Sequence, residues 1–173
     1  AVVIGRYAKN VKAANAMDYV FGYAAFIDVS ARGLGRTGMN SFIGKSFDTF
    51  APIGPCIVTA DEIPDPHKLH VQLWDDGQLR HDYNTDDMEH QIPALLEWAT
   101  NVMGLNPGDF LACGTNHQGL GPMQDGERVE IEIERIGRFG VNVVDPLKRT
   151  WPKMVDVEAA RRVREQQPLQ PSH

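Results

Sequence analysis

The sequence predicts a mainly β fold of the α+β class, in which one amphipathic helix packs against the sheets. Apolar and acidic residues alternate from Val129 to Glu134, the pattern of a half-buried strand. Residues 70–83 predict a hairpin that turns at Asp76-Gly77, and residues 88–103 carry apolar side chains at helical spacing. Strand patterns predominate, and strands do not alternate regularly with helices. We therefore expect packed sheets and a single main helix.

The first part of the chain predicts short elements between turns. Residues 2–4 predict a strand that Gly5 ends, and the alanine-rich residues 9–19 predict a short helix. A second strand is expected over residues 22–30. One of its faces would carry Ala24, Phe26, Asp28 and Ser30. The glycine-rich residues 33–44 predict a mobile loop, and flanking prolines predict one short buried strand over residues 56–58.

The second part contains the main helix and two further strands. Its apolar stripe consists of Ile92, Leu95, Leu96, Ala99, Val102 and Met103. Residues 85–87 offer capping side chains, and Gly104 offers a stop. A turn at 106–109 is expected to lead into a strand at 110–115. The composition changes at Trp151, so we expect one domain over residues 1–150 and a helical or disordered tail over residues 151–173.

The composition bounds the function. A chain of 173 residues with a formal net charge of −6 has no basic stripe, which argues against a nucleic-acid partner. No apolar run is long enough to cross a membrane, and no signal peptide is recognised. Cys56 and Cys113 lie in apolar contexts, which favours reduced, buried thiols in a cytoplasmic protein.

Two acidic or histidine-containing patterns have simple structural explanations. Glu130, Glu132 and Glu134 alternate with apolar residues, so a solvated strand face is favoured over a metal cluster. His67 and His70 have a ligand-like spacing, but they lie in a proline-rich turn without a carboxylate cluster of their own. We expect neither pattern to bind a metal.

Three other features leave alternatives open. The sequence GTNHQGLG, residues 114–121, is either a ligand-binding turn or a hairpin turn; it lacks the ending of a phosphate loop. Lys45 is either an anion anchor or a surface lysine. Asp28 stands alone in an apolar run four residues before Arg32, so it either pairs with that arginine or holds a ligand. No nucleophile motif is present.

Several stretches together resemble the fumarylacetoacetate hydrolase family, and they span residues 1 to about 139. They are AVVIGR, AMDYVFGYAAFIDVSAR, GKSFDTFAPIGPCIVTADEIPDP, NPGDFLACGT and QDGERVEIEIERIGR. The DVSAR and GKSFDTF blocks, in this order and at this separation, are specific. The resemblance implies a mixed β-sandwich roll of the family's C-terminal domain type.

The resemblance also implies a site. Family members bind a divalent ion through three carboxylates and act on 2-oxo or β-diketo acids. Asp28 would be one metal ligand, and Thr49 would contact a second cation. Arg32 and Lys45 would be catalytic residues, and they would bind the substrate together with Thr115. The implied cofactor is Mg²⁺, with Mn²⁺ or Ca²⁺ as alternatives.

The chain departs from the family pattern at several points. Gly33 and Gly35 stand where the family usually has an acid and a glutamine, which puts the substrate pocket in doubt. The two other metal ligands of the family form a Glu-x-Glu just upstream of AVVIGR. We therefore expect an N-terminal segment of the same polypeptide to supply them, and expect the chain to be inactive without it. The tail suggests a homodimer.

The first hypothesis is part of a metal-dependent hydrolase that cleaves C–C bonds in acylpyruvates or other β-diketo acids. The alternative is a decarboxylase or isomerase of 2-oxo or 2-hydroxy dienoates in aromatic-compound catabolism. A second alternative is a non-catalytic remnant of the fold.

Overall fold

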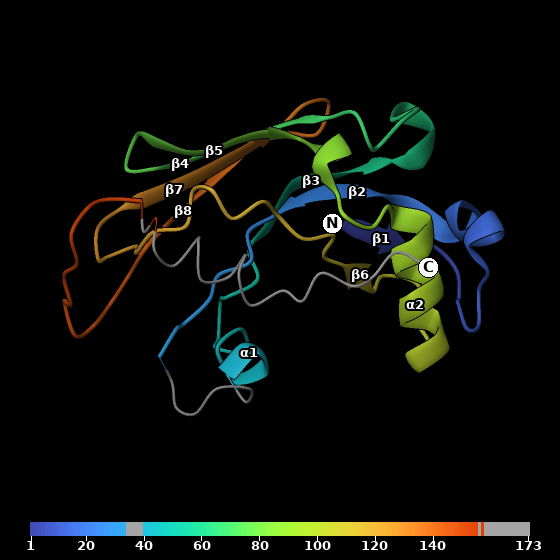
Figure 1. Ribbon diagram of the computed structural model, residues 1–173, viewed down its shortest axis with the longest axis horizontal. Helices are drawn as coiled ribbons and strands as arrows, with labels where there is room; N and C mark the ends of the chain where they lie inside the picture. The colour runs from blue at the N-terminus through green and yellow to red at the C-terminus, as the bar shows by residue number, and fades with distance from the viewer. Residues whose placement is uncertain (34–39, 156, 158–173) are drawn as a thin grey trace.

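The computed structural model of the chain describes residues 1–33, 40–155 and 157, and it consists mainly of two four-stranded sheets (Figure 1). Neighbouring strands run antiparallel in both sheets. The first sheet has the order β3-β2-β1-β6. Its strands are β1 (Val2–Ile4), β2 (Val20–Phe26), β3 (Ile53–Thr59) and β6 (Phe110–Leu111). The mainly β class predicted from the sequence is confirmed.

The second sheet has the order β5-β4-β7-β8. Its strands are β4 (His70–Asp75), β5 (Gln78–Asn84), β7 (Arg128–Ile133) and β8 (Gly137–Asn142). The hairpin of β4 and β5 turns at Asp76 and Gly77, both of which have positive φ angles, as predicted. Val129 and Ile131 are buried. Glu130 lies on the other face, 3.2 Å from Arg138, so the acidic alternation is a charged outer face.

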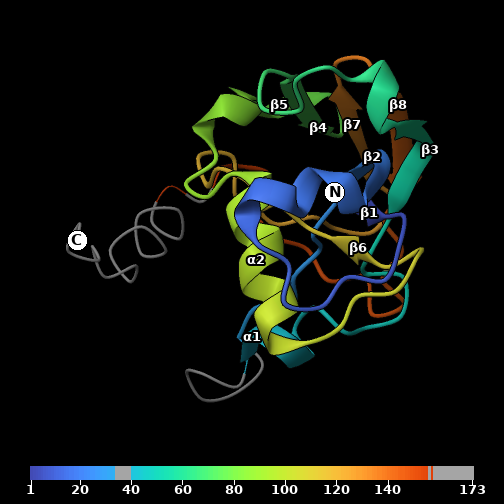
Figure 2. The same ribbon diagram turned by 90° about the vertical axis from the view of Figure 1, so that its right-hand side faces the viewer.

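Strand β3 lies at the edge of the first sheet and beside β8, so the two sheets meet along this side (Figure 2). A Cβ at Gly54 would lie 3.4 Å from the Phe139 ring, and the Sγ of Cys56 is 3.9 Å from the carbonyl oxygen of Ile136. The prediction of a short buried strand is wrong: β3 has seven residues, includes Pro55, and leaves Cys56 exposed. An edge strand tolerates proline because one row of its amides has no ladder partner.

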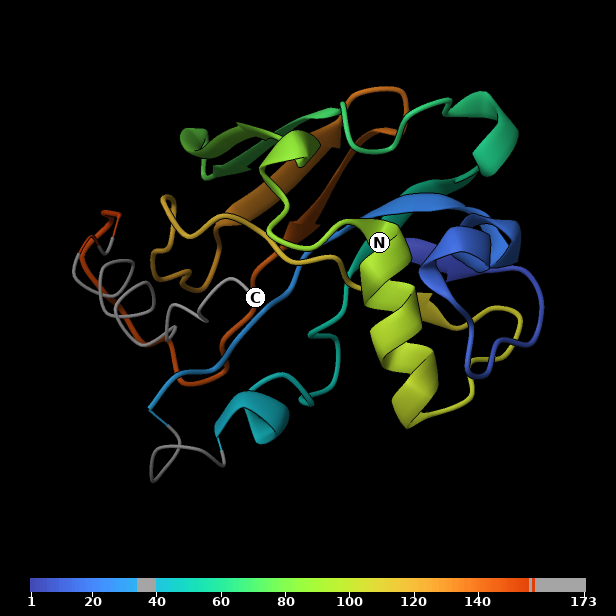
Figure 3. The same ribbon diagram turned by 45° about the vertical axis from the view of Figure 1, so that its right-hand side comes forward.

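Helix α2 (Ile92–Val102) packs against the 3₁₀ helix η1 (Ala13–Tyr19) beside the first sheet (Figure 3). The predicted helix 88–103 is therefore too long. Residues 85–87 form a separate 3₁₀ turn, η3 (Thr85–Asp87), and the amide of Ile92 donates to Nε2 of His67 over 3.2 Å. Val102 and Met103 were placed in the apolar stripe, but they are exposed because the helix ends there.

The segment after β2 also differs from the prediction. β2 ends at Phe26, so Asp28 does not lie on a strand face. The predicted loop 33–44 contains the short helix α1 (Asn40–Ile43), which lies away from both sheets (Figure 3). A third 3₁₀ turn, η2 (Ala60–Glu62), follows β3. The strand predicted at 110–115 is limited to β6.

The tail was expected to be helical or disordered. Most of it, residues 156 and 158–173, lies outside the described residues. Within the described part of the chain, no helix has the length and apolar character that crossing a membrane requires.

Candidate functional site

A cavity of about 240 Å³ lies between the two sheets. Most of its wall is apolar and comes from the inner faces of the sheets, including Val71, Ile131 and Ala24. The polar lining comes from the segment after β2, from β5 with the end of β4, and from the loop after β6. Its members include Asp28, Ser30, Arg32, His81, Tyr83 and Thr115. An apolar cavity with a few convergent polar groups is the usual form of a small-molecule site.

Asp28 and Lys45 form an ion pair beside this cavity. The Nζ of Lys45 contacts Oδ2 of Asp28 and also donates to Oγ of Ser30 over 3.1 Å. The amide of Ala31 donates to the carbonyl oxygen of Gly44 over 2.8 Å, and this bond holds the two segments together. Both charged side chains remain partly exposed, 41% for Asp28 and 44% for Lys45. The sequence left open whether Asp28 pairs with Arg32 or holds a ligand; in the structure Asp28 forms its ion pair with Lys45.

Arg32 and Thr115 enter the cavity from different elements. Arg32 follows Asp28 in the segment after β2, whereas Thr115 lies in the loop after β6. Gly114, with a φ of +89°, turns the backbone immediately before Thr115. The hydroxyl of Thr115 lies 3.1 Å from that of Tyr83 and 3.3 Å from the carbonyl oxygen of Asn116. The cavity thus brings Asp28, Arg32 and Thr115 together.

Thr49 occupies a different place. It lies in the turn between α1 and β3, is exposed, and adopts a φ of +69°. It is not part of the cavity lining. Its role as a second cation contact stays a prediction.

Sequence reasoning missed His81 and Tyr83, because it treated β5 as half of a hairpin. Leu73 pairs with His81 while Trp74 pairs with Leu79, so Arg80 is an extra residue in β5. This bulge changes the parity of the strand and lets both Arg80 and His81 face inward. The pattern His-x-Tyr was visible in the sequence, but the face on which it lies depends on the bulge.

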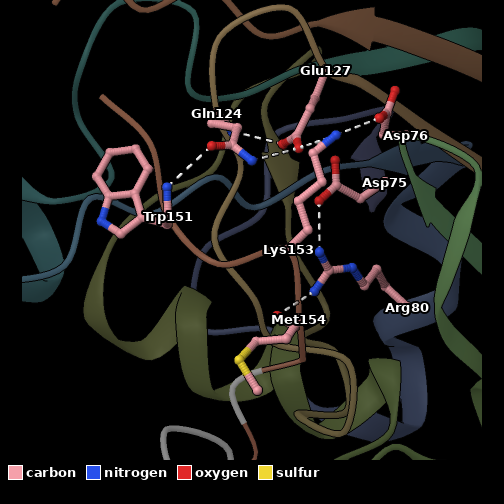
Figure 4. A network of polar contacts seen from close by, with 8 residues as sticks. All are labelled: Asp75, Asp76, Arg80, Gln124, Glu127, Trp151, Lys153 and Met154. Carbon is pink, nitrogen blue, oxygen red and sulfur yellow. Dashed lines mark hydrogen bonds and ion pairs between the residues drawn. The ribbon is translucent and has the colours of Figure 1, made fainter. Parts of the chain in front are cut away.

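Arg80 forms a buried ion pair at the inner end of the cavity (Figure 4). Its Nη2 lies 3.0 Å from Oδ2 of Asp75, and both side chains are at least 95% buried. Burial and the nearby Glu127 raise the pKa of Asp75, whereas Arg80 lowers it. The charges of this pair largely offset each other, so the inner end of the cavity carries little net charge.

The chain after β8 lies across this ion pair (Figure 4). The Nη1 of Arg80 donates to the carbonyl oxygen of Met154 over 2.8 Å. Lys153 lies 2.6 Å from Asp76 and 3.2 Å from Glu127, and the amide of Trp151 donates to Gln124 over 3.1 Å. Residues 151–154 are therefore bound to the second sheet.

The described residues do not form a metal site by themselves. Asp28 supplies one carboxylate, and no group of three or more His, Cys, Asp or Glu residues suited to a metal occurs in the described part of the chain. Oxygen ligands suit a hard ion such as Mg²⁺ or Mn²⁺, so a carboxylate such as Asp28 is a suitable ligand. One carboxylate is too few to hold the ion. A complete site would need carboxylates beyond those described.

The two packed sheets, with a mainly apolar cavity between them, define a β-sandwich protein with a candidate small-molecule site. More specifically, the chain belongs to the fumarylacetoacetate hydrolase family. The family model described as fumarylacetoacetate (FAA) hydrolase C-terminal matches residues 1–144.

Curated relatives support this assignment. An uncharacterized protein from Pyrococcus horikoshii is 42% identical over 148 residues, covering 83% of this chain and 64% of its own length. A mitochondrial oxaloacetate tautomerase from Xenopus laevis is 40% identical over 153 residues, covering 83% of this chain and 48% of its own length. The chain thus spans about half to two thirds of these relatives.

Solved structures agree in fold. A 5-carboxymethyl-2-hydroxymuconate delta-isomerase from Mycobacterium smegmatis has a TM-score of 0.77 at 40% identity, covering 83% of this chain and 55% of its own. A maleylpyruvate hydrolase from Sphingobium, solved with manganese(II) and pyruvate, has a TM-score of 0.75 at 40% identity, covering 83% of this chain and 51% of its own. Family members with this fold thus include isomerases and hydrolases.

Proposed function

We propose that this chain is part of an enzyme that converts a 2-oxo acid through its enol or enolate form. The proposal rests on the ion pair between Lys45 and Asp28. Asp28 lines the same cavity as Arg32 and Thr115. A cation, a guanidinium group and a hydroxyl are the groups that a carboxylate and a developing enolate oxygen require.

The residues of the chain have separate roles in this proposal. Arg32 and Thr115 bind the substrate carboxylate, which orients the neighbouring 2-oxo group. Lys45 lies where its positive charge can stabilise the oxygen that becomes negative as the enolate forms. The apolar walls from both sheets would contact the rest of the substrate.

Two reactions are compatible with this enolate. Isomerisation or tautomerisation only moves a proton, and relatives named as an oxaloacetate tautomerase and a delta-isomerase favour it. C–C hydrolysis is the second candidate. The pyruvate in the maleylpyruvate hydrolase structure favours it, because pyruvate is the fragment that hydrolysis of an acylpyruvate leaves.

The proposal includes a divalent ion, Mg²⁺ or Mn²⁺, with Asp28 as one ligand. The remaining ligands would come from a Glu-x-Glu segment of the same polypeptide, and the active protein would be a homodimer. Exposed apolar side chains on and after α2, namely Trp98, Val102 and Met103, are compatible with a subunit contact. Sedimentation of the purified protein tests the dimer.

The experiment uses the protein with any Glu-x-Glu segment that its reading frame supplies. Oxaloacetate and maleylpyruvate are each incubated with it in D₂O with Mn²⁺, and NMR follows deuterium entry at C3 and product formation. Deuterium exchange without cleavage supports the tautomerase, and pyruvate release from maleylpyruvate supports the hydrolase. If the folded protein catalyses neither reaction, the result favours the non-catalytic alternative.

A matched pair of variants links turnover to the site. Lys45→Met removes the charge beside Asp28, and Lys68→Met removes an exposed lysine that pairs with Asp65. We expect the first to lose turnover and the second to retain it. Equal turnover in both variants would contradict the role of Lys45.

A further inference from the structure

Tyr83 reaches the cavity because of the bulge in β5. Tyr83 pairs with Val71 and His81 pairs with Leu73, and both partners face the core. In an antiparallel ladder directly paired residues share a face, so Tyr83 and His81 also point inward. In a regular strand, Leu79, His81 and Tyr83 would lie on the same face. Because Arg80 is an extra residue, Leu79 lies on the opposite face and is exposed. Two polar rings therefore line an otherwise apolar wall.

The Tyr83 hydroxyl is joined to the hydroxyl of Thr115, which comes from the loop after β6. The two oxygens lie 3.1 Å apart, and both residues line the cavity. Burial raises the pKa of Tyr83, so its phenol keeps its proton and remains a hydrogen-bond donor at neutral pH. Two adjacent hydroxyls, each with a rotatable proton, can turn toward the two oxygens of one carboxylate.

His81 supports the loop that carries Thr115. Its side chain hydrogen bonds to that of Asn116, and its ring packs edge-on against Tyr83 with centroids 6.3 Å apart. Burial lowers the pKa of His81, and the nearby His117 and Arg80 lower it further. The ring is thus neutral near pH 7, so it adds no charge to this end of the cavity.

We propose that the hydroxyls of Tyr83 and Thr115 together form the carboxylate-binding end of the cavity, which makes Tyr83 a substrate-binding residue. The identity of the ligand as a 2-oxo acid rests on the proposed function. The recognition itself rests on the hydroxyl pair and on Arg32, which supplies a positive charge to the same cavity.

The test compares two ligands that differ only in charge and hydrogen-bonding pattern. Pyruvate carries a carboxylate, and pyruvamide carries a neutral amide of nearly the same shape. NMR titration gives their dissociation constants for the wild-type protein and for Tyr83→Phe, which keeps the ring and its packing. Tyr19→Phe removes a hydroxyl outside the cavity lining and serves as the control.

We expect Tyr83→Phe to weaken pyruvate binding about tenfold to a hundredfold, the usual effect of losing a hydrogen bond to a charged group. Pyruvamide binding should change by less than about threefold, and Tyr19→Phe should change neither. Unchanged pyruvate binding, an equal loss for both ligands, or no pyruvate binding to the wild-type protein would overturn the proposal.

A double-mutant cycle with Thr115→Val separates joint from independent action. If the hydroxyls bind one carboxylate together, the loss in the double variant is smaller than the product of the two single losses. Strictly multiplicative losses would argue against a shared subsite. These binding results do not depend on turnover. If the protein with its Glu-x-Glu segment is inactive but shows Tyr83-dependent pyruvate binding, the proposed function is refuted and this inference stands.

Discussion

Lys45 and Asp28 form an ion pair between the segment after α1 and the segment after β2, 17 residues apart in the chain. Ser30 shares the lysine, with its Oγ 3.1 Å from Nζ. The pair lies at the edge of the cavity, which Asp28 and Arg32 both line.

The first prediction concerns the charge of Lys45. Lys45→Met should lower kcat about 100-fold or more, the usual range for a group that stabilises a developing oxyanion. The fold should be little affected, because an exposed ion pair contributes little to stability. Steady-state kinetics and thermal unfolding of the same sample check both expectations. A variant that loses activity only because it unfolds would contradict this prediction.

The second prediction concerns the buried pair of Arg80 and Asp75. Arg80→Met leaves the Asp75 carboxylate buried without its partner, which typically costs about 3–5 kcal/mol of unfolding free energy. The double variant Asp75→Leu with Arg80→Met removes both charges and should recover most of this loss. Urea denaturation of the three proteins measures the difference. No recovery in the double variant would show that the contact with Met154, rather than the ion pair, accounts for the loss.

The third prediction concerns the pH dependence that His81 causes. Its folded pKa is below the ordinary value near 6.5, so the unfolded chain binds more protons and stability falls as the pH drops below about 6.5. His81→Gln removes this loss. The unfolding free energy of His81→Gln minus that of wild type should therefore increase as the pH is lowered from 7.5 to 5.5.

Urea denaturation at several pH values measures this change, with His90→Gln at an exposed position as the control. Parallel stability curves for wild type and His81→Gln would show that the folded pKa of His81 is not lowered.

The fourth prediction concerns Asp145, whose pKa is lowered to about 2, chiefly by the hydrogen bonds of the Arg149 side chain. The Nε and Nη2 of Arg149 lie 2.7 and 3.1 Å from the two carboxylate oxygens. A lowered carboxylate pKa stabilises the fold above the unfolded value near 3.9, and this contribution is lost as the pH falls through about 2.

Arg149→Gln should raise the pKa of Asp145 toward the unfolded value and move the midpoint of acid unfolding to higher pH. A carboxyl ¹³C NMR titration follows Asp145 directly, with Arg135→Gln as the control. An unchanged titration of Asp145 in Arg149→Gln would contradict the assigned cause.

The fifth prediction concerns the close approach of β2 and β3 at Gly22. A Cβ there would lie 2.2 Å from the carbonyl oxygen of Val58, which is backbone and cannot move aside freely. Gly22→Ala should therefore destabilise the fold by more than about 2 kcal/mol. In β8, a Cβ at Gly140 would meet the flexible side chains of Arg128 and Glu130, so Gly140→Ala should cost less than about 1 kcal/mol. Equal losses, measured by urea denaturation, would contradict this argument.

Local patterns predicted elements whose residues contact one another along a short stretch of chain. The β4–β5 hairpin follows from Asp76-Gly77, and β7 follows from apolar alternation, because turn geometry and side-chain parity are local. The end of β2 at Phe26 was missed because it depends on where its pairing with β3 ends, at Ile53. The exposure of Cys56 was missed because it depends on β3 being an edge strand. The burial of Val102 was also overestimated, since periodicity does not say where a partner surface stops.

By itself the sequence determined the family, the mainly β class and the residues Asp28, Arg32, Lys45 and Thr115 as site candidates. It did so because these residues lie in contiguous motifs. Only the tertiary structure decided that Lys45, rather than Arg32, pairs with Asp28. It also decided that a single extra residue, Arg80, turns His81 and Tyr83 into the cavity. The physical reason is that strand parity and ion-pair partners depend on contacts between residues far apart in the chain.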